Sequence, residues 1–79
     1  MKLPRDIDAA SLIKLLKPLG YEVTRQTGSH IRLTTLQNGE HHITIPNHNP
    51  IRIGTLSSVL SNIAAHFQLT KEELLKQIL

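Results

Sequence analysis

The sequence lacks cysteine and tryptophan, and its 79 residues include one tyrosine and one phenylalanine. Without cysteine, neither a disulfide nor a thiolate metal site can form. So few aromatic side chains argue against RNA recognition by bases that stack on an aromatic platform. No apolar run approaches the roughly 20 residues that a membrane helix needs, and the N-terminus lacks the apolar run of a signal peptide. We therefore expect one domain over residues 1–79, located in the cytoplasm and without a membrane partner.

Acidic residues are scarce in the middle of the chain. Between Val23 and Thr70 the only one is Glu40, whereas the same stretch holds three arginines and all five histidines. The formal net charge of the whole chain is +3. A basic segment of this kind fits a polyanionic partner, although charge alone slightly favours the simpler explanation of a surface with a small positive excess.

Apolar spacing predicts helices at both ends of the chain. After Asp8, which is a suitable N-cap, leucines recur at i, i+3, i+4 and i+7, and Gly20 follows them as a C-terminal stop. Further on, Thr55 is expected to cap a second helix. Thr70 and Glu73 form a capping box that predicts a short third helix.

Alternation of apolar and polar residues predicts three half-buried strands, over residues 21–24, 30–34 and 42–45. Between the last two, the segment 37–39 (Gln-Asn-Gly) suits a three-residue hairpin loop. The register of that loop would place the apolar residues of both strands on one face. The expected pairs are Leu33 with Ile43, Ile31 with Ile45, Arg32 with Thr44 and Thr34 with His42.

The element order is α-β-β-β-α-α, which predicts the α+β class. Helices would bracket a three-stranded antiparallel sheet and pack on its apolar face. This arrangement is similar to double-stranded-RNA-binding domains, with an extra short helix at the C-terminus. Likeness of fold does not by itself decide function.

The tripeptide Gly28-Ser29-His30 lies between the first two expected strands and carries the strongest chemical signal. A glycine turn lets a substrate approach closely, and it places an imidazole that exchanges protons near neutral pH at the start of a strand. Arg32 should project from the same strand face as His30, Arg25 lies just before the turn, and arginine suits a phosphate. The pattern predicts a phosphodiester site, whereas the simpler alternative is a surface histidine beside a glycine turn.

Two other kinds of site could use the same histidine. A metal site could join His30, His42 and His48, but the carboxylate and cysteine ligands that usually complete such sites are missing nearby. A nucleophilic Ser29 with His30 as its base is disfavoured, because adjacent strand residues diverge and no acidic residue is placed to orient the histidine. We therefore expect neither a metal nor another cofactor.

Five segments, weak one by one, form a specific pattern through their order and spacing. They are residues 12–21, 25–30 (Arg-Gln-Thr-Gly-Ser-His), 45–48 (Ile-Pro-Asn-His), 53–56 (Ile-Gly-Thr-Leu) and 69–74 (Leu-Thr-Lys-Glu-Glu-Leu). In this pattern the chain resembles the HicA family of toxins from bacterial type II toxin–antitoxin pairs.

The resemblance implies an endoribonuclease that cleaves messenger RNA, inhibits translation and growth, and is neutralised by a HicB-like antitoxin. The family's catalytic histidine corresponds to His30. The residues expected to contact single-stranded messenger RNA are Arg25, Gly28, Ser29, Arg32 and His42.

RNA carries its own nucleophile, the 2′-hydroxyl group, so the expected reaction needs no metal. His30 would remove that proton or protonate the leaving 5′-oxygen, and Arg25 or Arg32 would stabilise the charge on the phosphate. His42 or water would serve the other proton transfer. Two alternatives stay open: an RNA-binding module of the same fold without catalytic activity, and an inactivated toxin that only binds its partner.

Overall fold

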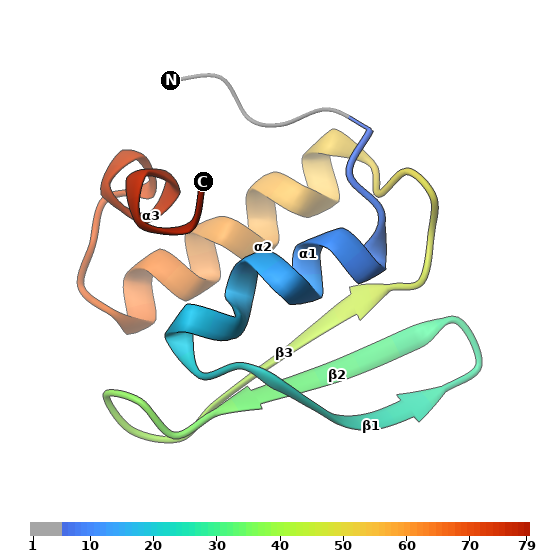
Figure 1. Ribbon diagram of the computed structural model, residues 1–79, viewed down its shortest axis with the longest axis horizontal. Helices are drawn as coiled ribbons and strands as arrows, with labels where there is room; N and C mark the ends of the chain where they lie inside the picture. Colours follow the sequence, from blue (N-terminus) through green and yellow to red (C-terminus); the bar gives the residue numbers. More distant parts are fainter. Residues whose placement is uncertain (1–5) are drawn as a thin grey trace.

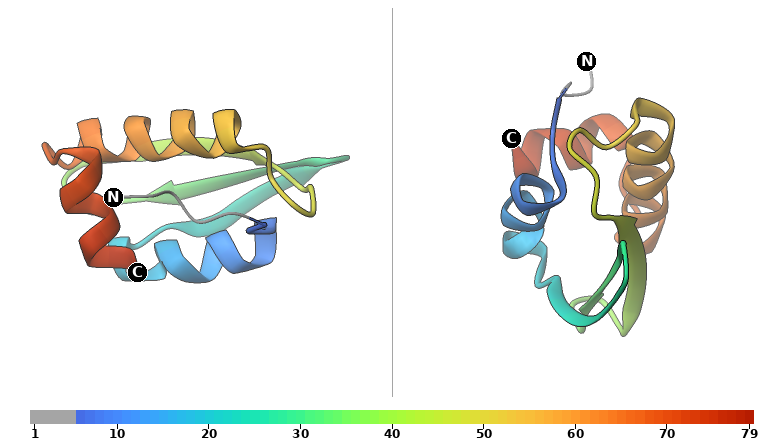
Figure 2. Two further views of the ribbon diagram at one scale, coloured as in Figure 1. Left: turned by 90° about the horizontal axis from the view of Figure 1, so that it is seen from above. Right: turned by 90° about the vertical axis from the view of Figure 1, so that its right-hand side faces the viewer.

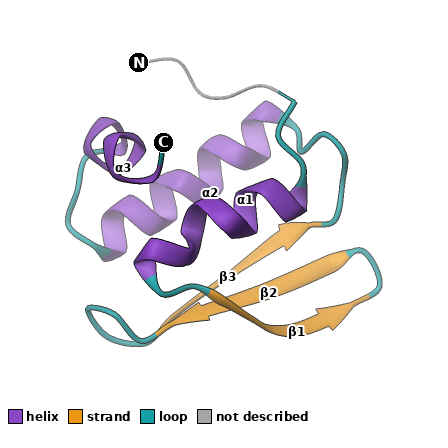
Figure 3. Cartoon of the chain, in the orientation of Figure 1, coloured by secondary structure: helices purple, strands orange, loops and turns teal. Residues whose placement is uncertain are grey.

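Two helices lie over one face of a three-stranded antiparallel sheet, and a third helix lies across their end (Figures 1 and 2). The computed structural model describes residues 6–79, so residues 1–5 of the predicted domain lie outside the described residues. The expected α+β class and element order are confirmed, with helices and strands in separate layers (Figure 3). The elements are α1 (Ala9–Leu16), the 3₁₀ turn η1 (Lys17–Leu19), β1 (Glu22–Thr27), β2 (His30–Thr35), β3 (His41–Pro46), α2 (Ile53–His66) and α3 (Lys71–Ile78).

The ends of α1 follow the predicted signals. Asp8 is the N-cap, and its Oδ1 accepts the backbone N–H of Ser11 at 2.8 Å. The chain tightens into η1 at Pro18 and turns at Gly20, whose φ of 82° favours glycine. A Cβ atom at Gly20 would lie 2.7 Å from Oγ1 of Thr35 in the sheet. Gly20 therefore allows the helix end and the sheet to approach closely.

The hairpin of β2 and β3 has the predicted register, including the pairs Leu33 with Ile43 and Arg32 with Thr44. The connection is longer than predicted, because the ladder stops at Thr35 and His41 and leaves residues 36–40 as the loop. A hydrogen bond to α2 holds this loop in place. Nδ2 of Asn38 donates to the backbone carbonyl of His66, at the end of α2, over 2.8 Å.

β1 departs from the predicted alternation. Its pairing with β2 shifts between Val23 and Arg25, so that Thr24 is the extra residue of a β-bulge. Strict alternation would place Arg25 on the same face as Val23, whereas the bulge moves Arg25 to the other face, opposite Arg32. The strand is not half-buried either, since all six of its residues are exposed and Val23 has 47% of its surface accessible. β1 is an edge strand, and Tyr21 just before it is the residue that enters the core.

The core lies between the helices and the inner face of the sheet. Burial of a large apolar side chain contributes about 1.5–3 kcal/mol, and this layer is where the chain concentrates such residues. The inner face takes the apolar side chains of β2 and β3 together with the buried Thr35, and the polar side chains from His30 to Thr34 and from His42 to Thr44 are left on the outer face. The largest fully buried apolar residues are Leu12, Leu16, Tyr21, Leu33, Ile45, Leu56, Leu60, Ile63, Leu74 and Leu75.

The start of α2 differs from the prediction. The helix begins at Ile53, so Thr55 lies inside its first turn and does not cap it. Arg52 is the N-cap and makes no side-chain capping bond. The start is set by tertiary contact instead, because the buried Ile51 just before it donates its backbone N–H to the carbonyl of Ile7 at 2.8 Å.

α3 begins at the predicted capping box. Oγ1 of Thr70 accepts the N–H of Glu73 at 3.0 Å, and the Glu73 carboxylate accepts the N–H of Thr70 at 2.8 Å. These bonds lower the pKa of Glu73. Across residues 6–79, none of the helices combines the length and the apolar character needed to cross a membrane.

Candidate nucleic-acid interface

The outer face of the sheet gathers the residues that the sequence singled out. Residues directly opposite one another in neighbouring strands share a face. His30 lies opposite Thr27 of β1 and Pro46 of β3, and Arg32 lies opposite Arg25. Because His30 and Arg32 are two residues apart in β2, all three basic side chains belong to the outer face. Strand pairing thus brings Arg25 to His30 and Arg32, which alternation alone does not.

His30 is presented by an open turn at one end of this face. Gly28 adopts a φ of 56°, and a Cβ atom built on it would meet nothing within 4 Å. The carbonyl of Ser29 accepts the backbone N–H of Asn47 at 2.6 Å, which fastens the turn to the loop after β3. His30 is exposed, and among residues 6–79 its ring has no hydrogen-bond or ion-pair partner. Both of its nitrogens are therefore open to a substrate.

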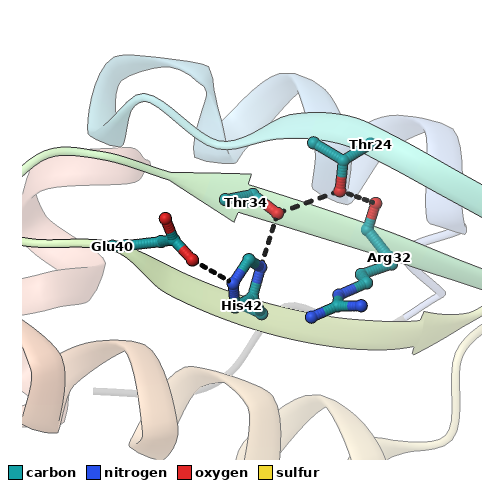
Figure 4. Close-up of polar contacts among 5 residues, drawn as sticks. All are labelled: Thr24, Arg32, Thr34, Glu40 and His42. Atoms are coloured by element: carbon teal, nitrogen blue, oxygen red, sulfur yellow. Dashed lines mark hydrogen bonds and ion pairs between the residues drawn. The ribbon is translucent and has the colours of Figure 1, made fainter.

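Arg25 and Arg32 form an uncompensated pair of like charges. Like charges directly opposite each other destabilise a sheet. In the part of the chain that the structure describes, the one contact of a basic side chain with a carboxylate joins His42 to Glu40, and neither arginine has a carboxylate partner. Figure 4 shows the Arg32 side chain reaching over β3 toward the ring of His42. An anion bound at these arginines would relieve their repulsion, and guanidinium groups suit a phosphate.

His42 shares this face but lies far from His30. It is opposite Thr34, four residues along β2 from His30, which is about 14 Å at roughly 3.4 Å per residue. Both of its ring nitrogens are engaged, Nε2 with Oε2 of Glu40 at 2.8 Å and Nδ1 with Oγ1 of Thr34 at 2.7 Å (Figure 4). The structure does not bring His42 to His30, and neither nitrogen is free to exchange a proton with a group bound at His30.

The contacts of His42 extend into a chain of hydroxyl groups that sequence reasoning missed. Oγ1 of Thr34 lies 2.9 Å from Oγ1 of Thr24, the residue that the bulge adds to β1. Glu40, the single acidic residue in the middle of the chain, holds the other end. The predicted pairing of Thr34 with His42 gave one link. The link to Thr24 depends on the bulge, for which the sequence has no clear signal.

Two further histidines have roles in packing. His41 and His66 stack with ring centroids 4.3 Å apart and an interplanar angle of 9°. Nδ1 of His41 lies 2.7 Å from the hydroxyl of Tyr21, and burial raises the pKa of Tyr21 to about 12. Burial, followed by the nearby charge of His66, lowers the pKa of His41. These rings join the hairpin loop to the end of α2.

The fifth histidine, His48, lies exposed in the loop after β3. Among residues 6–79, no three histidine, aspartate or glutamate side chains come together as metal ligands. His30 and His42, two of the three ligands in the alternative metal site, lie too far apart along the sheet to bind one ion. The three residues of that site are therefore not assembled.

Comparison with known protein families adds an independent observation. A family model described as the HicA toxin of bacterial toxin–antitoxin systems matches residues 9–64, which extend from the start of α1 into α2 and include the whole sheet. The chain belongs to the HicA toxin family. Membership implies an antitoxin partner for this HicA-family chain. The match ends before α3, so residues 69–74 lie outside it, and comparisons with curated proteins and with solved structures return no match.

Proposed function

We propose that this HicA-family chain is a metal-independent endoribonuclease that cleaves messenger RNA in the cytoplasm and thereby inhibits translation, with His30 as its catalytic residue. The observation that supports it best is the free imidazole of His30 beside two arginines, Arg25 and Arg32, whose charges no carboxylate balances within residues 6–79. A phosphate held by the arginines would lie two residues along β2 from His30, roughly 7 Å.

The proposed reaction uses the 2′-hydroxyl of RNA as the nucleophile. Its oxygen bonds to phosphorus while the bond from phosphorus to the 5′-oxygen breaks, which leaves a 2′,3′-cyclic phosphate and a 5′-hydroxyl. His30 removes the 2′ proton or protonates the 5′-oxygen, and such assistance is worth about 10²- to 10⁴-fold in rate. Arg25 and Arg32 stabilise the negative charge that develops on the phosphate. Because His42 is distant and fully engaged, water at the exposed His30 serves the other proton transfer.

Gly28 and Ser29 would contribute access and a backbone position. The open space around Gly28 lets the sugar-phosphate chain approach the turn. Ser29 holds the turn against the loop after β3 through its carbonyl, which leaves its hydroxyl available to a phosphate oxygen.

The antitoxin partner is proposed to be HicB-like and to cover the outer face of the sheet. An acidic surface over Arg25 and Arg32 would neutralise their repulsion and exclude RNA from His30. Inhibition would then follow from occlusion and need no change in the fold of the toxin.

Incubation of the purified chain with a long single-stranded RNA, with and without excess EDTA, tests this function. We expect cleavage that persists in EDTA and is lost in His30→Ala, since the reaction needs the imidazole and no metal. Cleavage that disappears with EDTA would return the metal site to consideration. Binding of RNA without cleavage by either protein would identify a non-catalytic RNA-binding module instead.

A further inference from the structure

A hollow at the end of the outer face remote from His30 has no part in the proposed reaction. It borders the place where β1, β2 and the chain after η1 meet, and Thr34 on its wall lies four residues along β2 from His30. Leu36 on its rim has 76% of its surface exposed, unusual for a large apolar side chain. The residues that line it are Gly20, Glu22, Thr24, Thr34, Leu36 and Gln37. We call it the base hollow.

Hydrogen bonds fix the hydroxyl groups of the base hollow. An ionised Glu40 can only accept, so Nε2 of His42 carries the proton directed at it. Nδ1 of the same ring lies 2.7 Å from Oγ1 of Thr34. Oγ1 of Thr24 lies 2.9 Å from Oγ1 of Thr34, and the Thr24 hydroxyl donates to the backbone carbonyl of Arg32 at 3.5 Å. Glu40 and His42 therefore act as positioning residues, which leave oxygen lone pairs of Thr24 and Thr34 as acceptors at the hollow.

The hollow is consequently rich in acceptors. Glu22 lies directly opposite Thr34 and adds an exposed carboxylate, which also accepts only. Such a site repels a phosphate. It suits a group that donates hydrogen bonds, and the exposed side chain of Leu36 offers an apolar surface to the flat face of a ring.

Position along the sheet relates the hollow to the phosphate site. Moving along β2 from His30, Arg32 comes after two residues and Thr34 after four. Each pair of residues spans roughly 7 Å, a step similar to one nucleotide of an extended RNA strand. A strand whose scissile phosphate lies at Arg25 and Arg32, between His30 and Thr34, would therefore bring a neighbouring base to the hollow.

We propose that the base hollow reads a nucleobase bearing an exocyclic amino group, with Glu22 as the acceptor of that group. The proposal rests on the proposed function, since it takes the outer face as the RNA track. Carboxylates accept hydrogen bonds from the amino group of cytosine in nucleic-acid recognition. Uracil has the same ring but a carbonyl oxygen at that position. This oxygen and the Glu22 carboxylate both only accept hydrogen bonds, so they would repel each other.

The experiment measures RNA binding in the His30→Ala background, where cleavage cannot change the substrate. Short single-stranded RNAs that differ only by cytidine or uridine at one position, placed in turn along the strand, are titrated by fluorescence anisotropy. We expect cytidine to bind about fivefold more tightly at one position. Glu22→Gln, which keeps the shape of the side chain, should remove this preference, and Thr34→Val should weaken it.

Glu72→Gln is the matched control, because it removes an exposed carboxylate from α3, away from the sheet. Thermal unfolding verifies that each variant is folded. Equal affinity for cytidine and uridine at every position, or a preference that survives Glu22→Gln, would overturn the proposal. If the wild-type chain fails to cleave RNA while the His30→Ala protein still prefers cytidine, the ribonuclease function is wrong and the base hollow stands.

Discussion

The two ends of the sheet use histidine in opposite ways. At the end formed by the Gly28 turn, His30 is exposed and, within residues 6–79, its ring contacts no polar partner. At the end formed by the loop 36–40, every histidine is engaged: His41 with Tyr21, His42 with Glu40 and Thr34, and His66 with the carbonyl of Gln37. One end leaves its histidine free of intramolecular polar contacts, whereas the other uses its histidines to hold the fold.

This difference shows that the number of histidines says little about the site. A ring whose nitrogens are both bonded inside the protein cannot take a proton from a substrate without breaking those bonds. A ring without partners can, although nothing fixes its orientation until a ligand binds. The catalytic proposal therefore rests on His30, and replacing histidines at the two ends should separate activity from stability.

The largest effect is expected for His30→Ala. Loss of the acid–base group should lower the rate of RNA cleavage by about 10²- to 10⁴-fold. The thermal unfolding midpoint should stay close to that of the wild type, because the ring has no intramolecular polar partner among the described residues. A variant at the other end, His41→Leu, should do the reverse and lower the midpoint while cleavage persists. If His41→Leu instead abolished cleavage in a folded protein, the division between the two ends would be wrong.

A smaller effect is expected for the arginines of the outer face. Arg25→Ala and Arg32→Ala should each weaken RNA binding and reduce the slope of log affinity against log salt concentration by about one. Neither should destabilise the fold, because each removes one of two like charges that face each other. Arg52→Ala, at the start of α2, is the matched control and should leave the slope unchanged. Binding titrations over a range of salt concentrations give the slopes.

The smallest expected effect is a change in folding stability with pH. Burial and the charge of His66 hold the pKa of His41 below its ordinary value of 6.5, so as pH falls the unfolded chain takes up this proton before the folded chain does. The stability that comes from neutral His41 is fully present above pH 6.5 and is lost as the pH falls from there toward the lowered pKa. Thermal unfolding between about pH 7.5 and about pH 5 measures this loss.

His41→Gln, which cannot titrate, should flatten the pH dependence in this range. The lowered pKa values of Asp8 and Glu73 act at more acidic pH, since these carboxylates lose their capping bonds only when protonated. An unchanged pH profile in His41→Gln would show that another group governs the loss.

Where local chemistry and burial agree, the sequence was sufficient to predict the fold. The alternation in β2 and β3 and the loop expected over residues 37–39 both indicate one register, and the structure has that register with a longer loop. The α2 start was missed because Ile51 and its bond to Ile7 decide it, and such a tertiary contact leaves no capping signal at Thr55.

The candidate site was predictable only in part for a similar reason. His30 and Arg32 share a face by the period of two, which any strand imposes. Arg25 joins them because of the bulge at Thr24, and that depends on how β1 pairs as an edge strand. The chain from Glu40 to Thr24 could not be predicted either, since it crosses all three strands and needs the same bulge.

The most direct test of a ribonuclease centred on His30 uses RNA with a single 2′-deoxynucleotide at a mapped cleavage site. We predict that the wild-type chain stops cutting at that site, continues to cut elsewhere, and leaves 2′,3′-cyclic phosphate ends that mass spectrometry detects. Cleavage of the deoxy site at an undiminished rate would contradict attack by the 2′-hydroxyl, and with it the role given to His30.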